Sequence, residues 1–326
     1  MTRKTTTLQP ALHAIRDAQR LLRAHFPITR LIEAPSLSAL AGGRVSLKME
    51  TDLPTGSFKV RGAMYALATH LQRRAIREVV ASSTGNHGAA VAYAAKLLGL
   101  RAKIFLPAGC NRVKRDRIAA LGADIVEKGN DGADAFALAS EWCAQAPDSF
   151  FLNDATDPDL PAGPGVIGLE ILEQNPSVQM IVVPMGDTAL IRGVGAAAKQ
   201  VSPRVKIVGV QAERAPSYYL SWKSGQATPT DSCNTFADGL ATRTPEAANV
   251  TAIREIVDDI VLVSEEAMLK AIRILLLQEH VVAEPAGAAS TAALLKKPPA
   301  DEKDVVLVVS GLNVSPEVLR QAVVSA

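Results

Sequence analysis

The sequence predicts an α/β fold in which helices cover both faces of parallel-rich, twisted sheets. Short runs rich in valine and isoleucine alternate along the chain with longer stretches whose apolar residues recur at helical spacing. The short runs are apolar at nearly every position, which is typical of strands buried on both faces. A chain of 326 residues is long enough for one large domain or two modest ones.

The first half of the chain reads as three strand–helix units. We expect strands at 78–82, 103–106 and 124–127, and helices at 88–98, 111–121 and 133–144. In the first helix, Val91, Ala92, Ala95 and Leu98 share one face. A helix also begins at Lys59. Alternation of this kind predicts a parallel sheet with helices packed on it.

The second half repeats the pattern. We expect strands at 180–184, 205–210, 260–263 and 304–309, with helices at 189–199, 265–280 and 287–296. Ser264 is the expected N-cap of the helix at 265–280, and Glu265 and Glu266 favour its positive end. Residues 213–250 are polar and rich in Pro and Thr, which predicts surface loop. The Pro/Gly-rich stretch 157–168 is interpreted as a crossing between two domains.

Composition excludes several classes of function. The 35 basic and 33 acidic side chains give a net charge of +2, and aromatic residues make up 4%, so we expect no nucleic-acid partner. No apolar run approaches the roughly 20 residues of a membrane span, and residues 1–26 lack the apolar core of a secretory signal. Three cysteines, Cys110, Cys143 and Cys233, lie far apart. Together these features predict a cytoplasmic protein with no membrane partner.

Two loops at the starts of predicted helices carry candidate chemistry. In residues 54–63, Lys59 occupies a helix N-terminus, where a cation is unfavourable. Burial there would lower the pKa of Lys59, which suits a Schiff-base amine, although most lysines are simply solvated. The loop Ser-Ser-Thr-Gly-Asn-His-Gly at 82–88 can offer backbone N–H groups to a carboxylate or a phosphate. His87 is either a general base or a structural residue.

Two further loops follow predicted strands, at the sheet edge where ligands bind in α/β proteins. Residues 184–193 could also bind an anion, but Asp187 would oppose a phosphate unless its side chain caps the following helix. After the last strand, Ser310 could contact a ligand heteroatom or merely end the strand.

Taken in order, these stretches resemble the tryptophan-synthase-β-like family, the fold type II pyridoxal-phosphate enzymes, and specifically its serine/threonine dehydratase branch. The resemblance covers about residues 30–315. The stretches that carry it are SFKVRGA (57–63), SSTGNHG (82–88), GPGVIGLEILEQ (163–174), VVPMGDTALIRG (182–193), EPAGAA (284–289) and VVLVVSGLN (305–313).

The resemblance implies a role for each matching position. Lys59 would form the Schiff base with pyridoxal 5′-phosphate and remove the substrate α-proton. Ser310 would face the pyridine nitrogen as a neutral hydroxyl, which favours elimination over transamination. The other implied cofactor contacts are Phe58, Asn86, Gly186, Asp187, Thr188, Ala189, Leu190 and Glu284. The implied contacts to the substrate are Ser83, Thr84, Gly85, Asn86, His87 and Ala155.

Four positions depart from the family pattern. The phosphate loop is Gly-Asp-Thr-Ala-Leu instead of nearly all glycine, so Asp187 must point away from the phosphate. Thr84 stands where racemising relatives carry serine, so its hydroxyl is a candidate catalytic group that could protonate the opposite face. Its methyl group crowds that face, so racemisation ranks below elimination. Gln211 and Ser217 replace acids of cation-binding relatives, so we expect no metal site.

The fourth departure is Asn-Asp-Ala-Thr-Asp at 153–157, which replaces His-Pro-Phe-Asp-Asp. Ala155 stands for a bulky aromatic residue. We therefore hypothesise a roomier or more polar pocket that admits a 3-hydroxy amino acid bulkier than threonine, such as phenylserine or 3-hydroxyaspartate.

The resulting expectation is a two-domain ammonia-lyase that converts a 3-hydroxy amino acid to a 2-oxo acid and ammonia. Residues 52–150 would form a small inserted domain, residues 1–51 and 151–326 the large one, with the cofactor in the cleft between them. The family forms dimers, so we expect a homodimer. The motifs end at Asn313, so we expect no C-terminal regulatory domain. Alternatives are a racemase, a β-replacement synthase or a non-catalytic ligand-binding relative. A nucleotide-binding Rossmann protein is disfavoured because no GxGxxG opens the first helix.

Overall fold

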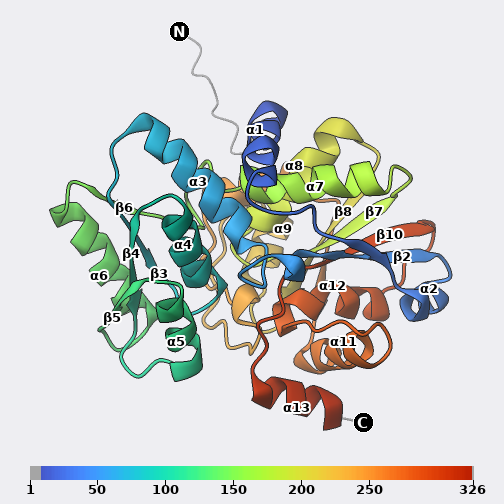
Figure 1. The fold of residues 1–326 in the computed structure, drawn as a ribbon. Coiled ribbons are helices and arrows are strands. Elements are labelled where there is room, and N and C mark those ends of the chain that lie inside the picture. The colour runs from blue at the N-terminus through green and yellow to red at the C-terminus, as the bar shows by residue number, and fades with distance from the viewer. Residues whose placement is uncertain (1–8, 325–326) are drawn as a thin grey trace.

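A computed structural model describes residues 9–324 of the chain. Figure 1 shows two sheets side by side, each with helices on both faces. The smaller sheet has four strands and the larger has six. The α/β class and the parallel-rich sheets predicted from the sequence are confirmed. No helix within residues 9–324 combines the length and apolarity that a bilayer crossing requires.

The four-stranded sheet is built from residues 78–151 and is parallel throughout. Its strands, in spatial order, are β5 (Asp124–Glu127), β4 (Arg101–Leu106), β3 (Glu78–Ser82) and β6 (Ser149–Phe151). Around it lie α3 (Lys59–Arg73), α4 (Asn86–Leu97), α5 (Arg112–Ala120) and α6 (Gly132–Gln145). Val79 and Ala81 of β3 join an apolar cluster with α3 and α4, whereas Val80 joins Ala135 and Ala139 of α6. Strand β3 is therefore buried on both faces.

The six-stranded sheet is antiparallel only at its β1–β2 edge. Its strands, in spatial order, are β1 (Leu31–Glu33), β2 (Arg44–Met49), β10 (Asp304–Val309), β7 (Met180–Pro184), β8 (Lys206–Ala212) and β9 (Asp259–Val263). The helices on one face are α7 (Ala162–Gln174), α8 (Ala189–Val201) and α10 (Ala247–Ile256), and those on the other are α2 (Pro35–Ala41), α11 (Glu265–Leu277) and α12 (Pro285–Lys296). In β10, Val306 and Val308 face the first group, and Val305, Leu307 and Val309 face the second.

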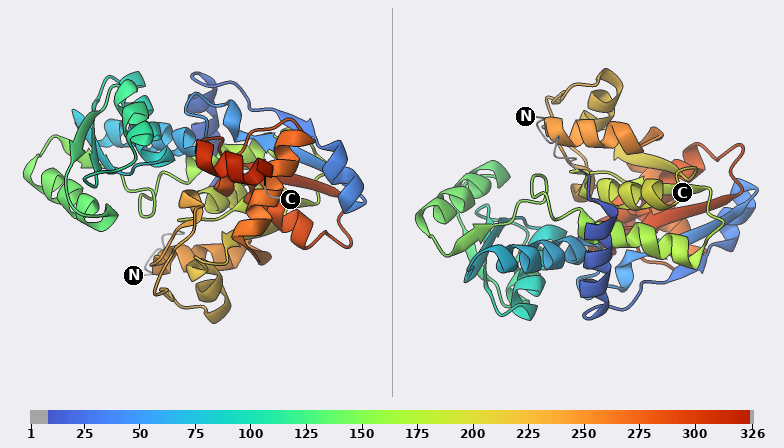
Figure 2. Two further views of the ribbon diagram at one scale, coloured as in Figure 1. Left: turned by 90° about the horizontal axis from the view of Figure 1, so that it is seen from below. Right: turned by 90° about the horizontal axis from the view of Figure 1, so that it is seen from above.

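Helix α1 (Leu12–Arg23) lies across the junction between the two sheets (Figure 2). Its residues Ile15, Ala18 and Leu22 are buried in one cluster with side chains of α3 and α7. The apolar core is thus continuous across the junction. The remaining elements are the short helices η1 (Glu50–Asp52) and η2 (Asp238–Leu240), and helices α9 (Ser217–Ser224) and α13 (Pro316–Val324).

One sequence interpretation was wrong. Residues 213–250 are not only loop, because they contain α9 and the start of α10. The interpretation of residues 157–168 as a crossing between two domains stays a prediction, and these residues include the first half of α7, which is buried. Its glycines serve helix packing: a Cβ on Gly163 would lie 2.3 Å from the Arg61 carbonyl oxygen, and one on Gly193 of α8 would lie 2.4 Å from that of Pro161. Ser264 caps α11 as predicted, since its hydroxyl accepts the Ala267 N–H at 3.2 Å.

Candidate active site

The loop that precedes α3 is joined to the loop that follows β10. The Phe58 N–H donates to the Ser310 carbonyl oxygen at 3.0 Å, and the Leu312 N–H donates to the Gly56 carbonyl oxygen at 2.9 Å. Ser57 and Gly311 form an isolated β-bridge between these bonds. The two loops are about 250 residues apart in sequence, yet this pairing places Ser310 beside the start of the helix that carries Lys59.

The same junction holds Asn86, the first residue of α4. The Asn313 side-chain amide donates to the Thr55 carbonyl oxygen at 3.0 Å and to Asn86 Oδ1 at 2.5 Å. Asn86 Nδ2 donates to Glu284 Oε1 at 2.7 Å. The Glu284 N–H in turn donates to the Gly311 carbonyl oxygen at 3.0 Å. The Asn86 amide is therefore held from both ends, and its orientation is set before any ligand arrives.

Lys59 is mostly buried, and its amine contacts a carboxylate that sequence reasoning did not single out. Lys59 Nζ donates to Asp154 Oδ2 at 2.5 Å, with the two side chains 18% and 17% exposed. The Phe58 ring centroid lies 5.5 Å from the same nitrogen. Asp154 lies next to Ala155 in the segment that leads from β6 to α7. Only the unusual Asn-Asp-Ala-Thr-Asp sequence could have drawn attention to it.

The expected lowering of the Lys59 pKa is wrong for this structure. Burial does favour the neutral amine, but the carboxylates of Asp154, Asp187 and Glu284 outweigh it and raise the pKa of Lys59. Burial of Asp154 opposes its charge, but His87 and Lys59 hold the pKa of Asp154 well below its usual range. The unliganded site therefore contains an ammonium–carboxylate pair.

The loop between β7 and α8 differs from the expected arrangement. Asp187 does not cap α8: its Oδ1 accepts from the Thr242 hydroxyl at 3.0 Å. Burial, together with Asp154, raises the pKa of Asp187. Thr188 has a left-handed backbone with φ of 69°, and its buried Oγ1 has no hydrogen-bond partner among the described residues. A Cβ on Gly186 would lie 2.2 Å from the Gly239 carbonyl oxygen, and Ala189 and Leu190 open α8 and are buried.

The loop before α4 is open to a ligand. The Gly85 N–H donates to Ser83 Oγ at 3.2 Å, and a Cβ on Gly85 would meet no atom within 4 Å. Thr84, between them, is half-buried. His87 is buried and held by a hydrogen bond of 2.9 Å between Nε2 and the Leu152 carbonyl oxygen. Its Nδ1 has no hydrogen-bond partner among residues 9–324 and lies 3.7 Å from Asp154 Oδ2.

Glu284, at the N-terminus of α12, carries a perturbed carboxyl group. Burial raises its pKa to about 7, although the hydrogen bond from Asn86 opposes the change. The carboxyl group therefore exchanges its proton near neutral pH. It lies against the Gly311 backbone, since a Cβ on Gly311 would be 2.2 Å from Glu284 Oε1.

A buried charge network fixes the first turn of α3. The Arg61 guanidinium, 1% exposed, makes paired hydrogen bonds of 2.8 to 3.0 Å to the carboxylates of Glu50 and Glu170. Lys48 Nζ adds a bond of 2.6 Å to Glu170 Oε2. Arg61 belongs to the SFKVRGA motif, but its partners are distant in sequence. The network ties the start of the lysine-bearing helix to β2, η1 and α7 of the larger sheet.

Residues Gln211 and Ser217, which replace acids of cation-binding relatives, are engaged in hydrogen bonds. Gln211 Oε1 accepts the Tyr219 N–H at 2.7 Å, and the Ser217 hydroxyl donates to the Thr242 carbonyl oxygen at 2.6 Å. Both side chains are buried. The absence of a metal at this place stays a prediction.

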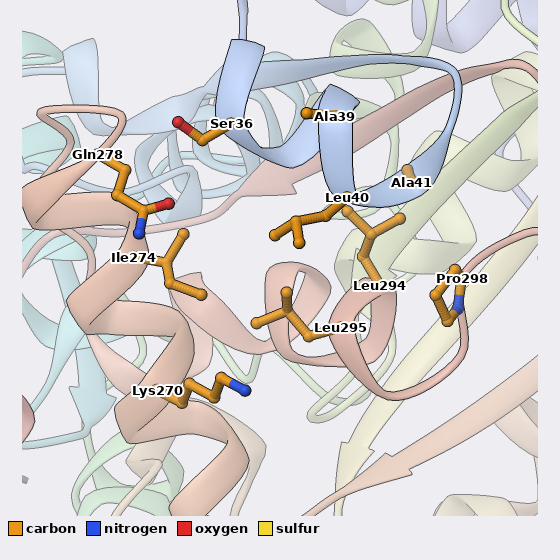
Figure 3. A pocket seen from close by; sticks show the side chains of 10 residues that line it. All are labelled: Ser36, Ala39, Leu40, Ala41, Lys270, Ile274, Gln278, Leu294, Leu295 and Pro298. Atoms are coloured by element: carbon orange, nitrogen blue, oxygen red, sulfur yellow. The ribbon is translucent and has the colours of Figure 1, made fainter. Parts of the chain in front are cut away.

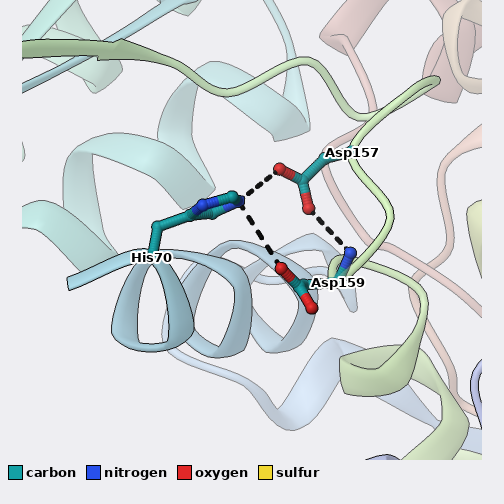
Figure 4. A group of neighbouring side chains, drawn as sticks. All are labelled: His70, Asp157 and Asp159. Atoms are coloured by element: carbon teal, nitrogen blue, oxygen red, sulfur yellow. Dashed lines mark hydrogen bonds and ion pairs between the residues drawn. The ribbon is translucent and has the colours of Figure 1, made fainter. Parts of the chain in front are cut away.

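Two other features lie away from these loops. An apolar pocket between α2, α11 and α12 (Figure 3) has few polar groups and shares no residue with the four loops; it is lined by Ser36, Ala39, Leu40, Ala41, Lys270, Ile274, Gln278, Leu294, Leu295 and Pro298. His70 Nε2 lies 2.8 Å from Asp157 Oδ2 and 3.7 Å from Asp159 Oδ2, and Figure 4 shows the three side chains facing one another. Asp159 is also paired with Arg73 at 2.5 Å. This second cluster joins the end of α3 to the segment before α7.

The residues at the junction fit pyridoxal phosphate. A mostly buried amine suits a Schiff base, and the unpaired hydroxyl of Thr188, beside the N-terminus of α8, suits a phosphate. The buried Ser57 hydroxyl and His87 Nδ1 likewise have no hydrogen-bond partner within the described part of the chain. Such buried polar atoms are normally satisfied, so the hydroxyls of Thr188 and Ser57 are available to donate hydrogen bonds to a polar, anionic ligand.

The two helix-covered sheets, with a mostly buried lysine where their loops meet, define the class of fold type II pyridoxal-phosphate enzymes. Residues 22–311 match the family described as "Pyridoxal-phosphate dependent enzyme". The chain belongs to this family, and within it to the ammonia-lyase (dehydratase) branch of its relatives, so it is an enzyme that uses pyridoxal phosphate.

The similarity to individual proteins extends over most of the chain. It is 38% identical to the L-threonine ammonia-lyase of Thermotoga maritima over 96% of this chain and 78% of the relative. It is 34% identical to the catabolic L-threonine dehydratase of Escherichia coli over 87% of this chain and 86% of the relative. Among solved structures, a threonine deaminase from T.th. superposes with a TM-score of 0.87 at 32% identity, covering 94% of this chain and 99% of that one. Maize serine racemase superposes with a TM-score of 0.91 at 28% identity, covering 96% and 97%.

Proposed function

We propose that this protein is an ammonia-lyase that converts a 3-hydroxy amino acid, with threonine among its substrates, to a 2-oxo acid and ammonia. The observation that carries the proposal is the mostly buried Lys59 amine at the meeting point of the loops that contain Asn86, Asp187 and Ser310. The names of the threonine-acting relatives support the same reaction.

Each residue has a role in this proposal. Lys59 Nζ would bond the cofactor and, once released by the substrate amine, take the proton from the substrate α-carbon. The bound cofactor supplies the electron sink that makes this proton removable. Residues Ser83–His87 would bind the substrate carboxylate through backbone N–H groups, and Thr84 would face the substrate. Asp154, which pairs with Lys59, would stabilise the ammonium that results, and this ammonium would give its proton to the β-hydroxyl, which leaves as water.

The other predicted site residues would hold the cofactor. Thr188, Ala189 and Leu190 would bind its phosphate through backbone N–H groups and the Thr188 hydroxyl, while Asp187, which accepts from Thr242, faces away toward that residue. Ser310 would contact the ring nitrogen, and Phe58 would pack near the ring.

Organisation at a larger scale is part of the proposal. Residues 52–150 would form the small domain and residues 1–51 with 151–326 the large one, a division that the two separate sheets support. The protein would act as a homodimer in the cytoplasm. The arrangement would let the small domain close over the substrate and exclude water from the reaction.

The experiment that tests the function combines a spectrum with a product assay. Purified protein should show the absorbance band of a lysine Schiff base, and borohydride should attach the cofactor to Lys59. Threonine or serine alone should yield a 2-oxo acid and ammonia, whereas β-replacement would need a second nucleophile. Lys59→Ala should abolish band and product, and the surface variant Lys96→Ala should keep both. A colourless protein that borohydride does not label would refute the proposal.

A further inference from the structure

We propose that Asp154 determines substrate specificity by favouring substrates whose side chain carries a hydrogen-bond donor or a positive charge and by rejecting acidic side chains. This inference deepens the proposed function and rests on it, and of the substrates considered from the sequence it disfavours 3-hydroxyaspartate.

The position of Asp154 is the first reason. Its Oδ2 lies 2.5 Å from Lys59 Nζ and 3.7 Å from His87 Nδ1. Lys59 Nζ is the atom proposed to take the α-proton, so it must come within contact distance of the substrate α-carbon. A group within hydrogen-bond distance of that nitrogen therefore also lies beside the substrate, close to where the side chain begins.

The carboxylate is held in place by its surroundings. The neighbouring Ala155 carbonyl oxygen accepts from Asn249 Nδ2 of α10 at 2.9 Å, and the Ala155 N–H donates to Asn153 Oδ1 at 3.0 Å. Asp157, three residues after Asp154, accepts the Leu160 N–H through its Oδ1 at 3.0 Å. The segment thus has fixed contacts on both sides of Asp154. The next residue, Ala155, has only a methyl side chain.

The charge of the site is the second reason. Besides Asp154, the carboxyl groups of Asp187 and Glu284 act on Lys59. Among the described residues, the positive groups that act on these three are Lys59 itself, His87 when protonated, Arg117 and Lys114 toward Glu284, and the buried Arg192 toward Asp187. Within residues 9–324, only Lys59 and His87 act as cations on Asp154, so a further carboxylate on the substrate side chain would approach Asp154 without an added positive charge to balance it.

A donor on the substrate would instead replace a contact that Asp154 loses. When Lys59 Nζ is bonded to another group, it has fewer N–H donors to offer to Asp154. A buried carboxylate that loses a donor is destabilised unless another donor replaces it. An ammonium, amide or hydroxyl group on the substrate side chain can supply that donor.

The test measures binding rather than turnover. Aspartate, asparagine and 2,4-diaminobutyrate have similar length and lack a β-hydroxyl leaving group, so their dissociation constants can be read from the absorbance change of the cofactor-loaded enzyme. We expect the wild type to bind 2,4-diaminobutyrate at least tenfold more tightly than aspartate, with asparagine between them. Asp154→Asn should lower this ratio at least tenfold.

Asp159→Asn is the matched control, because it makes the same chemical change in the same segment at a residue paired with Arg73 instead of Lys59. It should keep the wild-type ratio. If Asp154→Asn does not fold, Asp154→Ser should show the same loss of discrimination.

The outcomes separate the two proposals. An enzyme that eliminates threonine but keeps its ligand ratio in Asp154→Asn would overturn the specificity role alone. The role would also be overturned if the substitution shifted only the pH titration of the cofactor absorbance, since Asp154 would then be merely a counter-ion of Lys59. A protein without the Schiff-base band would overturn both proposals.

Discussion

Replacing Arg61 by methionine should destabilise the protein strongly without removing any group proposed to touch the substrate. The guanidinium makes five hydrogen bonds, which go to Glu50, Glu170 and the Thr29 hydroxyl. Methionine has a comparable length and fills much of the space, but it carries no donor. Two buried carboxylates would then lose their shared partner.

The magnitude follows from the charges in the network. Lys48 and Arg61 balance Glu50 and Glu170, and all four side chains are at most 2% exposed. The substitution leaves one uncompensated negative charge in the core. Removing one partner of a buried ion pair costs roughly 3–5 kcal/mol in the free energy of unfolding.

Urea unfolding followed by circular dichroism measures this loss. The control is Arg30→Met, because Arg30 also makes a bidentate bond, with Asp52 at 2.7 and 3.0 Å, but is 65% exposed. That variant should lose less than about 1 kcal/mol. The double variant Arg61→Met with Glu50→Gln restores neutrality and should be more stable than Arg61→Met alone. Equal losses for Arg61→Met and Arg30→Met would refute the reasoning.

Two further predictions concern the unliganded protein and its cofactor affinity. The folded state raises the pKa of Glu284 from 4.5 to about 7, so this group favours folding below pH 4.5 and its contribution is lost as pH rises through 7. Glu284→Gln should therefore be more stable than the wild type above pH 7, by about 3 kcal/mol at most in the free energy of unfolding. A difference in unfolding free energy that does not vary with pH would contradict this. Thr188→Gly should relieve the strain of a left-handed threonine and stabilise the unliganded protein by about 1 kcal/mol in thermal unfolding. The same variant should bind the cofactor severalfold more weakly, whereas Thr188→Ser should keep the affinity. Tighter cofactor binding by Thr188→Gly would show that the Thr188 hydroxyl does not contact the phosphate.

The sequence predicted the strands and the class of fold well because buried parallel strands have a strong local signal. The runs at 78–82 and 304–309 coincide with β3 and β10. The start of α7 was not predicted as a helix, because glycines that usually indicate a loop are here the contact points of a helix pair. Only the packing of α7 against α3 and α8 distinguishes these meanings.

The sequence predicted the site residues that belong to recognisable motifs. It did not predict those whose role depends on tertiary contacts. Lys59, Asn86 and Ser310 belong to recognisable motifs, and the fold brings their loops together. Asp154 has no such signal, because its importance comes from a neighbour 95 residues earlier in the chain. Asp187 belongs to a recognisable motif, but its partner Thr242 lies in a region interpreted as surface loop and was not predicted.

The anchoring of Arg61 also decides which part of the enzyme can act as the fixed frame. Helix α3 packs on the four-stranded sheet, but its first turn is bonded to η1 and α7 of the six-stranded one. The first turn of α3, with Lys59, is therefore anchored to elements of the larger sheet's side, although residues 52–150 are the segment that we propose as the small domain. A rotation of the smaller sheet would move residues Ser83–His87 toward or away from Lys59. The substrate held by those residues would then be aligned against an amine whose position is fixed by the Arg61 network.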